Sequence, residues 1–454
     1  MRYFLDPFGC VKNQVDAENM MAHLNNAGWE PVSEEDADLI IVNSCGFIES
    51  AKQESIDAVL QWRNLYPKKK ILLAGCLAQR YATELPKNLQ EADGFFGVEN
   101  ISGIVQAAKS LFNDKGKSRR KLAQNDSIIA HHTGDRPLLS LPGSAYIKIS
   151  EGCNNNCSYC AIPLIRGILK SRTIPGIMDE FRTLLKRGIK EICIVGQDIG
   201  SFGIDTHNRS LLPHLLKEIS NTEGQFWVRL LYIHPDHFPL QILDVMESDS
   251  RILPYFDIPF QHSSAEILAA MNRRGTSKKY LDLIRTIRAR LQGAVIRSTF
   301  MLGFPGETEE DFSALLDFQE KAALDWVGCF AFSREEGTAA WNMKGRIAAK
   351  TAVMRKQLIE ERQIAVTEKN IDRFTGKTFD VLLEEKIELL PDSKEKSSHQ
   401  DEIWLGRLYC QAPEIDSTVV ITGTRDGFKA GTFVPCKIIA RRGFDLEAKI
   451  ASLY

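Results

Sequence analysis

Three cysteines close together in the chain are the residues best suited to do chemistry. Cys153, Cys157 and Cys160 have the spacing C-x3-C-x2-C within the stretch EGCNNNCSYC at positions 151–160. A structural zinc site is closed by four N or S ligands, so three thiolates are one too few. They are also one too few for a 4Fe–4S cluster, in which each iron normally binds a Cys thiolate. The spacing therefore predicts a cluster with one iron left open, and the alternative is a loop of unrelated cysteines.

Three more cysteines share a topological position near the N-terminus. Cys10, Cys45 and Cys76 follow expected strands at 2–8, 38–43 and 70–74, with expected helices ending at Gly28 and covering 48–65. This alternation predicts a doubly wound α/β domain, in which the carboxyl ends of the strands line one crevice. We therefore expect a second three-Cys cluster, with the flanking glycines letting backbone approach the cofactor. The alternative is that each is a small buried apolar residue.

A longer β/α alternation must position the first loop. Expected helices at 176–187, 211–220, 264–272 and 278–291 separate the expected strands, which lie at 146–149, 191–195, 226–231, 255–258, 294–302 and 326–332. About six such units suggest a partial barrel related to the eight-fold β/α barrel. Active sites of these barrels lie at the C-terminal ends of the strands, and the C-x3-C-x2-C loop follows the first strand.

Polar and Gly-rich residues follow other strands of this barrel. Gln197 and Asp198 follow the second strand, Gln261 and His262 the fourth, and the turn from Gly303 through Gly306 to Thr308 the fifth. That turn opens a helix whose N-terminal N–H groups could face an adenine or a ribose. Each has a plainer alternative, since Gly-Phe-Pro-Gly is a turn, Gln197 and Asp198 are suited to capping a helix, and His262 could be a structural hydrogen-bonding residue.

Composition sets the frame for these sites. A chain of 454 residues with 44% hydrophobic and 26% charged residues is expected to fold as two to four globular domains. No apolar run approaches the roughly 20 residues of a membrane helix, and no signal-peptide pattern opens the chain, which favours the cytosol. Ten cysteines in a reducing compartment indicate metal or redox chemistry. The net charge of −2 gives no general attraction to nucleic acid.

The remaining segments have simpler interpretations. The polar stretch 113–141, with its basic run 115–121 and with His131 and His132, is expected to be a linker. Short strand-like runs at 378–384, 403–409, 418–422, 431–440 and 444–450 predict a small antiparallel β-barrel of the oligonucleotide-binding kind. The other four cysteines fall in strand-like runs and are expected to be packing residues: Cys193, Cys329, Cys410 and Cys436.

These motifs carry a resemblance to a known family. The loop at a barrel mouth resembles the radical S-adenosylmethionine (SAM) superfamily, and the upstream triplet resembles its methylthiotransferase branch. The similarity to the RimO family runs over nearly the whole chain and is carried by the stretches at 9–13, 43–48, 51–57, 160–163, 165–167 and 413–416. The C-terminal barrel resembles a TRAM domain. It holds 11 Lys and Arg against 13 Asp and Glu from Lys377 onward, which suits a basic protein partner better than RNA; a structural cap is the alternative.

The resemblance implies an architecture and a set of cofactors. It implies an N-terminal methylthiotransferase domain at 1–112, a linker at 113–141, a radical SAM domain at 142–375 and a TRAM domain at 376–454. Two 4Fe–4S clusters would be held by the two cysteine triplets, with SAM at the open iron of the cluster on Cys153, Cys157 and Cys160. No other catalytic residue is assigned, and the candidate contacts to SAM are Tyr159, Gln197, Gln261, His262, Gly303 and Gly306.

The resemblance also implies a reaction. The RimO family methylthiolates an aspartate of ribosomal protein twelve of the small subunit, a C–H bond that only cofactor-supplied radical chemistry can open. One cluster would generate the 5′-deoxyadenosyl radical and the other would deliver sulfur. Expected partners are that ribosomal protein, free or in its subunit, and a one-electron reductant such as flavodoxin or ferredoxin, with no membrane, no favoured RNA contact and a monomeric, cytoplasmic enzyme.

Two other functions stay open at this point. A tRNA methylthiotransferase of the MiaB type would use the same chemistry on adenosine, although a basic C-terminal barrel would suit it better. A non-catalytic Fe–S carrier or RNA-binding scaffold would not need the long barrel with its SAM pocket.

Overall fold

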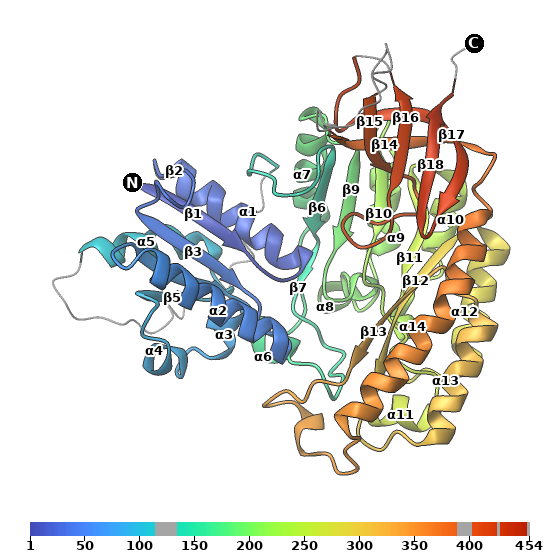
Figure 1. Cartoon of the computed structure of the whole chain (residues 1–454), viewed down its shortest axis with the longest axis horizontal. Coiled ribbons are helices and arrows are strands. Elements are labelled where there is room, and N and C mark those ends of the chain that lie inside the picture. Colours follow the sequence, from blue (N-terminus) through green and yellow to red (C-terminus); the bar gives the residue numbers. More distant parts are fainter. Residues whose placement is uncertain (114–133, 388–401, 425–426, 452–454) are drawn as a thin grey trace, which may run out of the picture.

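The computed structural model of the chain describes residues 1–113, 134–387, 402–424 and 427–451. The basic run 115–121, His131 and His132 lie outside the described residues. Figure 1 shows three units, with the N-terminal unit at the left, a long parallel sheet in the centre and the C-terminal strands above it. No helix in the described part of the chain is long and apolar enough to span a bilayer.

The N-terminal unit is a parallel sheet in the order β2-β1-β3-β4-β5. Alternate residues of β3 face opposite sides: Ile41 packs with α1 and α5, whereas Ile40 and Val42 pack with α2. The sheet is therefore doubly wound, as expected. Its elements are β1 (Arg2–Pro7), α1 (Val11–Asn26), β2 (Glu30–Pro31), β3 (Leu39–Ser44), α2 (Glu49–Leu65), β4 (Lys70–Gly75), α3 (Cys76–Arg80), α4 (Leu85–Asn88), β5 (Gly94–Phe96), η1 (Ile101–Gly103) and α5 (Ile104–Asn113).

The central unit is a six-stranded sheet, β6-β9-β10-β11-β12-β13, in which every neighbouring pair is parallel. This confirms the partial β/α barrel. Its elements are β6 (Ser144–Lys148), β7 (Ser150–Glu151), α6 (Ile162–Arg166), β8 (Lys170–Ser171), α7 (Ile174–Lys186), β9 (Glu191–Val195), η2 (Ile199–Ser201), α8 (Ile204–His207), α9 (Leu212–Ser220), β10 (Trp227–Leu230), η3 (Pro235–His237), α10 (Ile242–Ser248), β11 (Ile252–Asp257), α11 (Ala265–Ala270), α12 (Ser277–Arg290), β12 (Val295–Leu302), α13 (Glu309–Ala322), β13 (Trp326–Ala331), η4 (Ala339–Asn342) and α14 (Ala349–Asp372).

The C-terminal unit is a closed barrel in the order β14-β15-β16-β18-β17, with β16 and β18 as its parallel pair. Closure leaves no exposed sheet edge, which is the advantage of such small barrels. Its strands are β14 (Thr378–Ile387), β15 (Glu402–Arg407), β16 (Val419–Thr424), β17 (Phe433–Arg442) and β18 (Asp445–Ile450).

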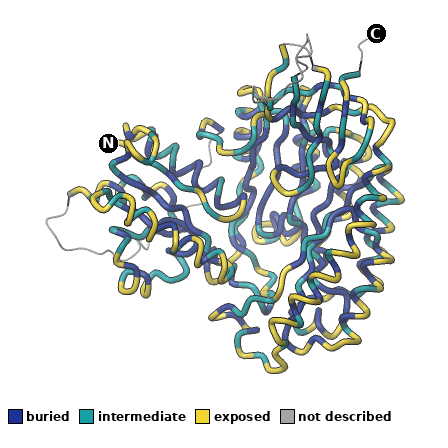
Figure 2. The backbone as a smooth tube through the Cα atoms, in the orientation of Figure 1, coloured by how far each residue is buried: buried dark blue, intermediate teal, exposed yellow. Residues whose placement is uncertain are grey.

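The three units share one apolar core on the concave face of the central sheet. Tyr146 and Tyr255 of the sheet, Val15 of α1 and Trp404 of the small barrel belong to the same buried cluster. The helices instead cover the convex face, and their outer sides are exposed (Figure 2). Asp416 fastens the small barrel by accepting a hydrogen bond from Tyr255 Oη at 2.6 Å and pairing with Arg297 at 2.9 Å.

Most expected elements are present, with differences of a few residues at their ends. The 24-residue helix α14 was missed, because its buried stripe alternates the apolar residues Ala352, Ile359 and Ile371 with the polar residues Arg355, Gln363 and Thr367, which weakens the apolar periodicity. The short strand β5 and helix α5 were also missed. Cys193, Cys329 and Cys436 are buried within strands as expected; Cys410 is buried too, but it lies in the turn after β15 and not in a strand.

Candidate functional site: two cysteine triplets

The loop that carries Cys153, Cys157 and Cys160 leaves the C-terminal end of the first barrel strand. It runs between β7 and α6 and is closed at its base by the short β7–β8 pair. Cys153 N donates to Gly167 O at 3.2 Å, and Cys160 N donates to Cys157 O at 3.0 Å. Gly152 has φ +69°, and a Cβ there would lie 2.1 Å from Ile168 O. The loop therefore folds back tightly on the residues that follow it, and only glycine fits its base.

Residues at three other places around the barrel mouth hold this loop. Ser158 N donates to Met271 O at 3.0 Å, and Ala340 N donates to Ser158 O at 2.7 Å. On the other side, Asn155 Nδ2 donates to Asp198 Oδ2 at 2.9 Å. Asp198 also accepts from Gly200 N, so it caps η2, one of the roles expected for it. The loop is thus fixed by Asp198 after β9, by the C-terminal end of α11 and by η4.

The three thiols of the loop interact with one another and with one buried cation. Burial raises the pKa of Cys160 to about 12 and that of Cys153 to about 11, and the charges of neighbouring thiols add to both shifts. Arg273 opposes both shifts. Its side chain is held by Pro259 O at 2.6 Å and Phe260 O at 2.8 Å, at the end of β11. A bound cation of iron would favour the thiolates that burial alone disfavours.

The second triplet is assembled from three neighbouring strands. Cys10 is the N-cap residue of α1 after β1, Cys45 follows β3, and Cys76 opens α3 after β4. Strands β1, β3 and β4 are adjacent and parallel, so their carboxyl ends meet. The charges of Cys10 and Cys45 both act on the pKa of Cys76, which burial raises to about 12. The structure therefore brings the three predicted residues together.

The glycines beside these cysteines lie where the cysteine loops come close together. A Cβ at Gly46 would lie 2.8 Å from the backbone of Cys76, and one at Gly75 (φ +96°) 2.6 Å from Ser44 O. A Cβ at Gly9 (φ +90°) would lie 3.0 Å from Cys45 Cβ. The glycines thus let the three cysteine loops approach each other, and their role beside a cofactor stays a prediction.

The six cysteine residues differ in their exposure to solvent. Cys10 is exposed and Cys45, Cys153, Cys157 and Cys160 are partly exposed, whereas Cys76 is buried. Among the described residues, no three His, Cys, Asp or Glu side chains are close enough to share a single metal ion. A four-iron cluster has a different requirement, because each thiolate ligates its own iron. The donor set, three thiols with nearby cations and one open position, fits such a cluster in both triplets.

The six candidate SAM contacts are distributed around the barrel mouth. Tyr159 packs beside Phe304 in a small apolar cluster. His262 is buried, its Nδ1 accepts from Ser264 N at 3.0 Å, and its Nε2 has no partner within the described chain. Burial lowers the pKa of His262 to about 4, so the ring is neutral at pH 7. Gln261 has φ +69°, an unusual backbone conformation for a residue other than glycine.

The remaining candidates differ in the space around them. A Cβ at Gly303 would lie 2.4 Å from Ala352 Cβ, so this glycine admits helix α14, whereas Gly306 has open space around it. The free N–H groups expected in this turn are partly used, because Glu307 Oε2 accepts from Gly303 N at 2.6 Å. Gln197 Nε2 donates to Glu151 Oε1 at 3.4 Å, toward the N-terminal unit.

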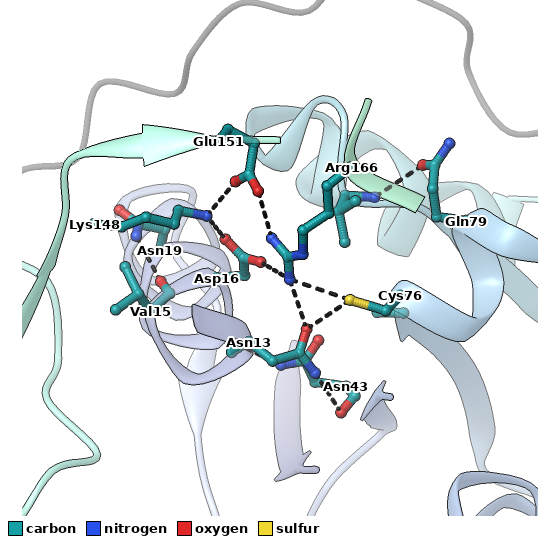
Figure 3. Close-up of polar contacts among 12 residues, drawn as sticks. Asn13, Val15, Asp16, Asn19, Asn43, Cys76, Gln79, Lys148, Glu151 and Arg166 are labelled. Carbon is teal, nitrogen blue, oxygen red and sulfur yellow. Dashed lines mark hydrogen bonds and ion pairs between the residues drawn. The ribbon is translucent and has the colours of Figure 1, made fainter. Parts of the chain in front are cut away.

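Two arginines of the site were missed by sequence reasoning. Arg273 faces the triplet of Cys153, Cys157 and Cys160 (the loop triplet). Arg166 of α6 donates from Nη2 to Cys76 Sγ at 3.1 Å (Figure 3). Lys12 is a third cation near the site, with its ammonium 3.3 Å from the ring centroid of Tyr232. Arg166 lies within one of the stretches that carried the family resemblance, so a signal existed; nothing in the sequence pointed to Arg273.

Comparison with protein families matches three models in succession. Residues 2–97 match "Uncharacterized protein family UPF0004", residues 147–318 the radical SAM superfamily, and residues 375–451 the TRAM domain. Among curated proteins, "Ribosomal protein uS12 methylthiotransferase RimO" of Treponema denticola is 46% identical, over 98% of this chain and 99% of that protein. The protein of the same name from Clostridioides difficile is 37% identical, over 99% of both.

Solved structures agree in fold. The radical SAM methyltransferase TsrM of Kitasatospora setae, with cobalamin and a [4Fe-4S] cluster bound, superposes with a TM-score of 0.57 at 13% identity, over 75% of this chain and 73% of that chain. The cobalamin-dependent radical enzyme OxsB gives a TM-score of 0.52 at 13% identity, over 81% of this chain and 56% of that chain. At these identities the likeness concerns the fold alone.

Proposed function

The chain belongs to the RimO family of ribosomal protein uS12 methylthiotransferases, and on this basis we propose that it attaches a methylthio group to the β-carbon of an aspartate of uS12 by radical SAM chemistry. The observation that carries the proposal is the adjacency of two three-cysteine sets. Arg166, in the helix that follows Cys160, contacts Cys76 of the other set at 3.1 Å. Radical generation and sulfur delivery would thus occur at neighbouring positions.

The two triplets are proposed as ligands of two 4Fe–4S clusters: Cys10, Cys45 and Cys76 for the auxiliary cluster, and Cys153, Cys157 and Cys160 for the radical SAM cluster. When bound, these groups and SAM supply the 5′-deoxyadenosyl radical and the transferred sulfur. The chain's own residues fix the geometry. Ser158 and Asn155 tie one loop to the barrel mouth, and the docked N-terminal unit brings the other triplet to it.

Contacts to SAM are proposed for Tyr159, Gln197, Gln261, His262, Gly303 and Gly306. The strongest support is His262, which is buried and neutral. With Nδ1 accepting from Ser264 N, its Nε2 must carry the proton and is left as an unused donor aimed away from its own backbone. A buried unpaired donor is costly, and a ligand acceptor would remove the cost. Gly306 supports the assignment by its open surroundings.

The substrate protein is proposed to contact the C-terminal barrel. That segment holds 11 Lys and Arg against 13 Asp and Glu, which favours a basic ribosomal protein over RNA. A one-electron reductant such as flavodoxin or ferredoxin is the second proposed partner. We further propose a monomeric enzyme of the cytoplasm, with domain boundaries at 112/113, 141/142 and 375/376.

Mass spectrometry of uS12 and of tRNA from a strain lacking this gene tests the substrate. We expect uS12 to lose the mass of one methylthio group and to regain it on complementation with the wild-type gene. A complementing copy with Cys153, Cys157 and Cys160 all changed to Ala is the matched negative control. Loss of a methylthio mark from tRNA, with uS12 unaffected, would refute the choice of substrate.

A further inference from the structure

Arg166 forms the centre of a buried charged network between two units of the chain. Its Nη1 lies 2.9 Å from Glu151 Oε1, and its Nη2 lies 2.9 Å from Asp16 Oδ2. Lys148 completes the network by pairing with Asp16 and, at 2.6 Å, with Glu151 Oε2. Two cations therefore face two carboxylates, and the side chains of Arg166, Lys148 and Asp16 are almost fully buried. Figure 3 shows the carboxylates on one side of the guanidinium.

The other side of the guanidinium faces the cysteines of the N-terminal unit. Arg166 Nη2 donates to Cys76 Sγ at 3.1 Å and lies 3.4 Å from Asn13 Oδ1 (Figure 3). Asn13 in turn donates to Phe8 O at 2.7 Å and to Ser44 O at 3.0 Å, the backbone just before Cys10 and Cys45. The charge of Arg166 acts on all three thiols of this triplet. Its side chain is thus directed at the triplet as a whole.

The backbone of Arg166 lies beside the loop that carries the other triplet. It is the last residue of α6, which starts two positions after Cys160, and the next carbonyl, Gly167 O, accepts from Cys153 N at 3.2 Å. A single residue therefore connects the loop of one triplet to a sulfur of the other. If its guanidinium turned away, Asp16 and Glu151 would each lose one of their two cationic partners and keep only Lys148, and the buried guanidinium would lose both carboxylates, a costly arrangement.

We propose that Arg166 is a positioning residue that donates a hydrogen bond to the Cys76 ligand of the auxiliary cluster, raises the reduction potential of that cluster and holds it in register with the loop of the radical SAM cluster. The physical reason is that a reduced cluster carries one more negative charge, which a buried cation and a hydrogen bond to a ligand sulfur stabilise. The inference rests on the proposed assignment of Cys10, Cys45 and Cys76 as cluster ligands.

The test uses full-length protein in which Cys153, Cys157 and Cys160 are changed to Ala, so that only the auxiliary cluster can form. Arg166→Gln removes the charge, and Arg166→Lys keeps it with a different reach. Arg80→Gln is the matched control, because the Arg80 side chain is only 4% exposed at the same boundary, bonds Glu335 at 2.7 Å and Gly46 O at 2.9 Å, and makes no hydrogen bond to a thiol among the described residues. Iron content and the midpoint potential from an EPR-monitored redox titration are measured for each.

We expect Arg166→Gln to lower the midpoint potential, Arg166→Lys to lower it less, and Arg80→Gln to leave it in place. Full iron content with an unchanged potential in Arg166→Gln would overturn the proposal. If Arg166→Gln loses its iron, the Arg166→Lys variant distinguishes two cases. Retained iron with a lowered midpoint potential in Arg166→Lys supports the proposal. Loss of iron from Arg166→Lys as well would mean that Arg166 has only a structural role. A parent that binds no iron would instead refute the auxiliary cluster, and with it the proposed function.

Discussion

The two cysteine triplets are both brought together by the fold, but by different structural means. Cys153, Cys157 and Cys160 lie on one loop, which closes on its own flanks through β7–β8 and the hydrogen bond from Cys153 N to Gly167 O. Cys10, Cys45 and Cys76 are far apart in the chain, and only the register of β1, β3 and β4 brings them together. The first site is therefore local and the second depends on tertiary structure.

The difference extends to the cation beside each triplet. Arg273 is held by the carbonyl groups of Pro259 and Phe260 within the barrel, so the loop triplet is served by its own unit. Arg166 comes to the other triplet from the barrel and is fixed by Asp16 and Glu151, one from each unit. The triplet of Cys10, Cys45 and Cys76 (the strand-end triplet) thus relies on docking of the two units. Substitutions at the boundary between these units should therefore affect it more than they affect the loop triplet.

Removing either triplet should abolish methylthiolation, but the two losses should differ in kind. With Cys153, Cys157 and Cys160 changed to Ala, we expect no 5′-deoxyadenosine from SAM under reducing conditions, because no cluster can bind SAM at an open iron. With Cys10, Cys45 and Cys76 changed to Ala, SAM cleavage should persist while uS12 gains no methylthio group. Chromatography of the anaerobic reaction measures both. Continued methylthiolation by the second variant would remove the distinction between the triplets.

Asp16→Asn tests whether docking supports the strand-end triplet. Asp16 is shared by Lys148 and Arg166, and breaking a buried ion pair by removing one partner costs about 3–5 kcal/mol. We expect a loss of this order in the free energy of unfolding from urea titration, with earlier unfolding of the N-terminal unit. Asp179→Asn, at an exposed pair with Arg182, should cost less than about 1 kcal/mol. Equal losses for the two variants would count against a docking role.

Matched glycine substitutions address each triplet separately. In Gly75→Ala the Cβ would lie 2.6 Å from Ser44 O, and in Gly152→Ala 2.1 Å from Ile168 O. Overpacking usually costs about 1–3 kcal/mol, and each variant should lose the iron of its own triplet only. Gly188→Ala is the control, because Gly188 also has positive φ, +86°, but open space around it. Loss of iron from both triplets in either variant would show that the sites are not independent.

A small effect of pH on the free energy of unfolding should arise beside the loop triplet. The hydrogen bond to Asp198, which also holds Asn155, raises the pKa of His237. A histidine whose pKa is raised in the folded state stabilises the fold. This contribution is fully present below the unfolded-state pKa of about 6.5 and disappears as pH rises through the folded-state pKa. Because His237 is 40% exposed, we expect His237→Gln to cost at most about 0.5 kcal/mol at pH 5.5 and less at pH 9. Urea unfolding at both pH values, with exposed His214→Gln as control, measures it; a larger cost at pH 9 would reverse the sign.

The sequence predicted what depends on local pattern. Strand and helix periodicity located both sheets, and cysteine spacing and strand-end positions located both triplets. It could not predict features that arise between units. Arg166 reaches Cys76 only because the N-terminal unit docks on the barrel. In α14, three of the six buried residues are Arg355, Gln363 and Thr367, which bond to groups distant in the chain. The close contact between the cysteine loops that the flanking glycines permit could not be predicted, because it depends on how the strands are aligned and not on local sequence.

Iron content tests the two-cluster assignment most directly. Anaerobically reconstituted wild-type protein should bind about eight irons and eight sulfides per chain, as two 4Fe–4S clusters require. Each triple Cys→Ala variant should retain about half, with the Mössbauer signature of one remaining 4Fe–4S cluster. A wild-type protein with only about four irons, or a variant at Cys10, Cys45 and Cys76 that keeps the full wild-type content, would contradict the assignment.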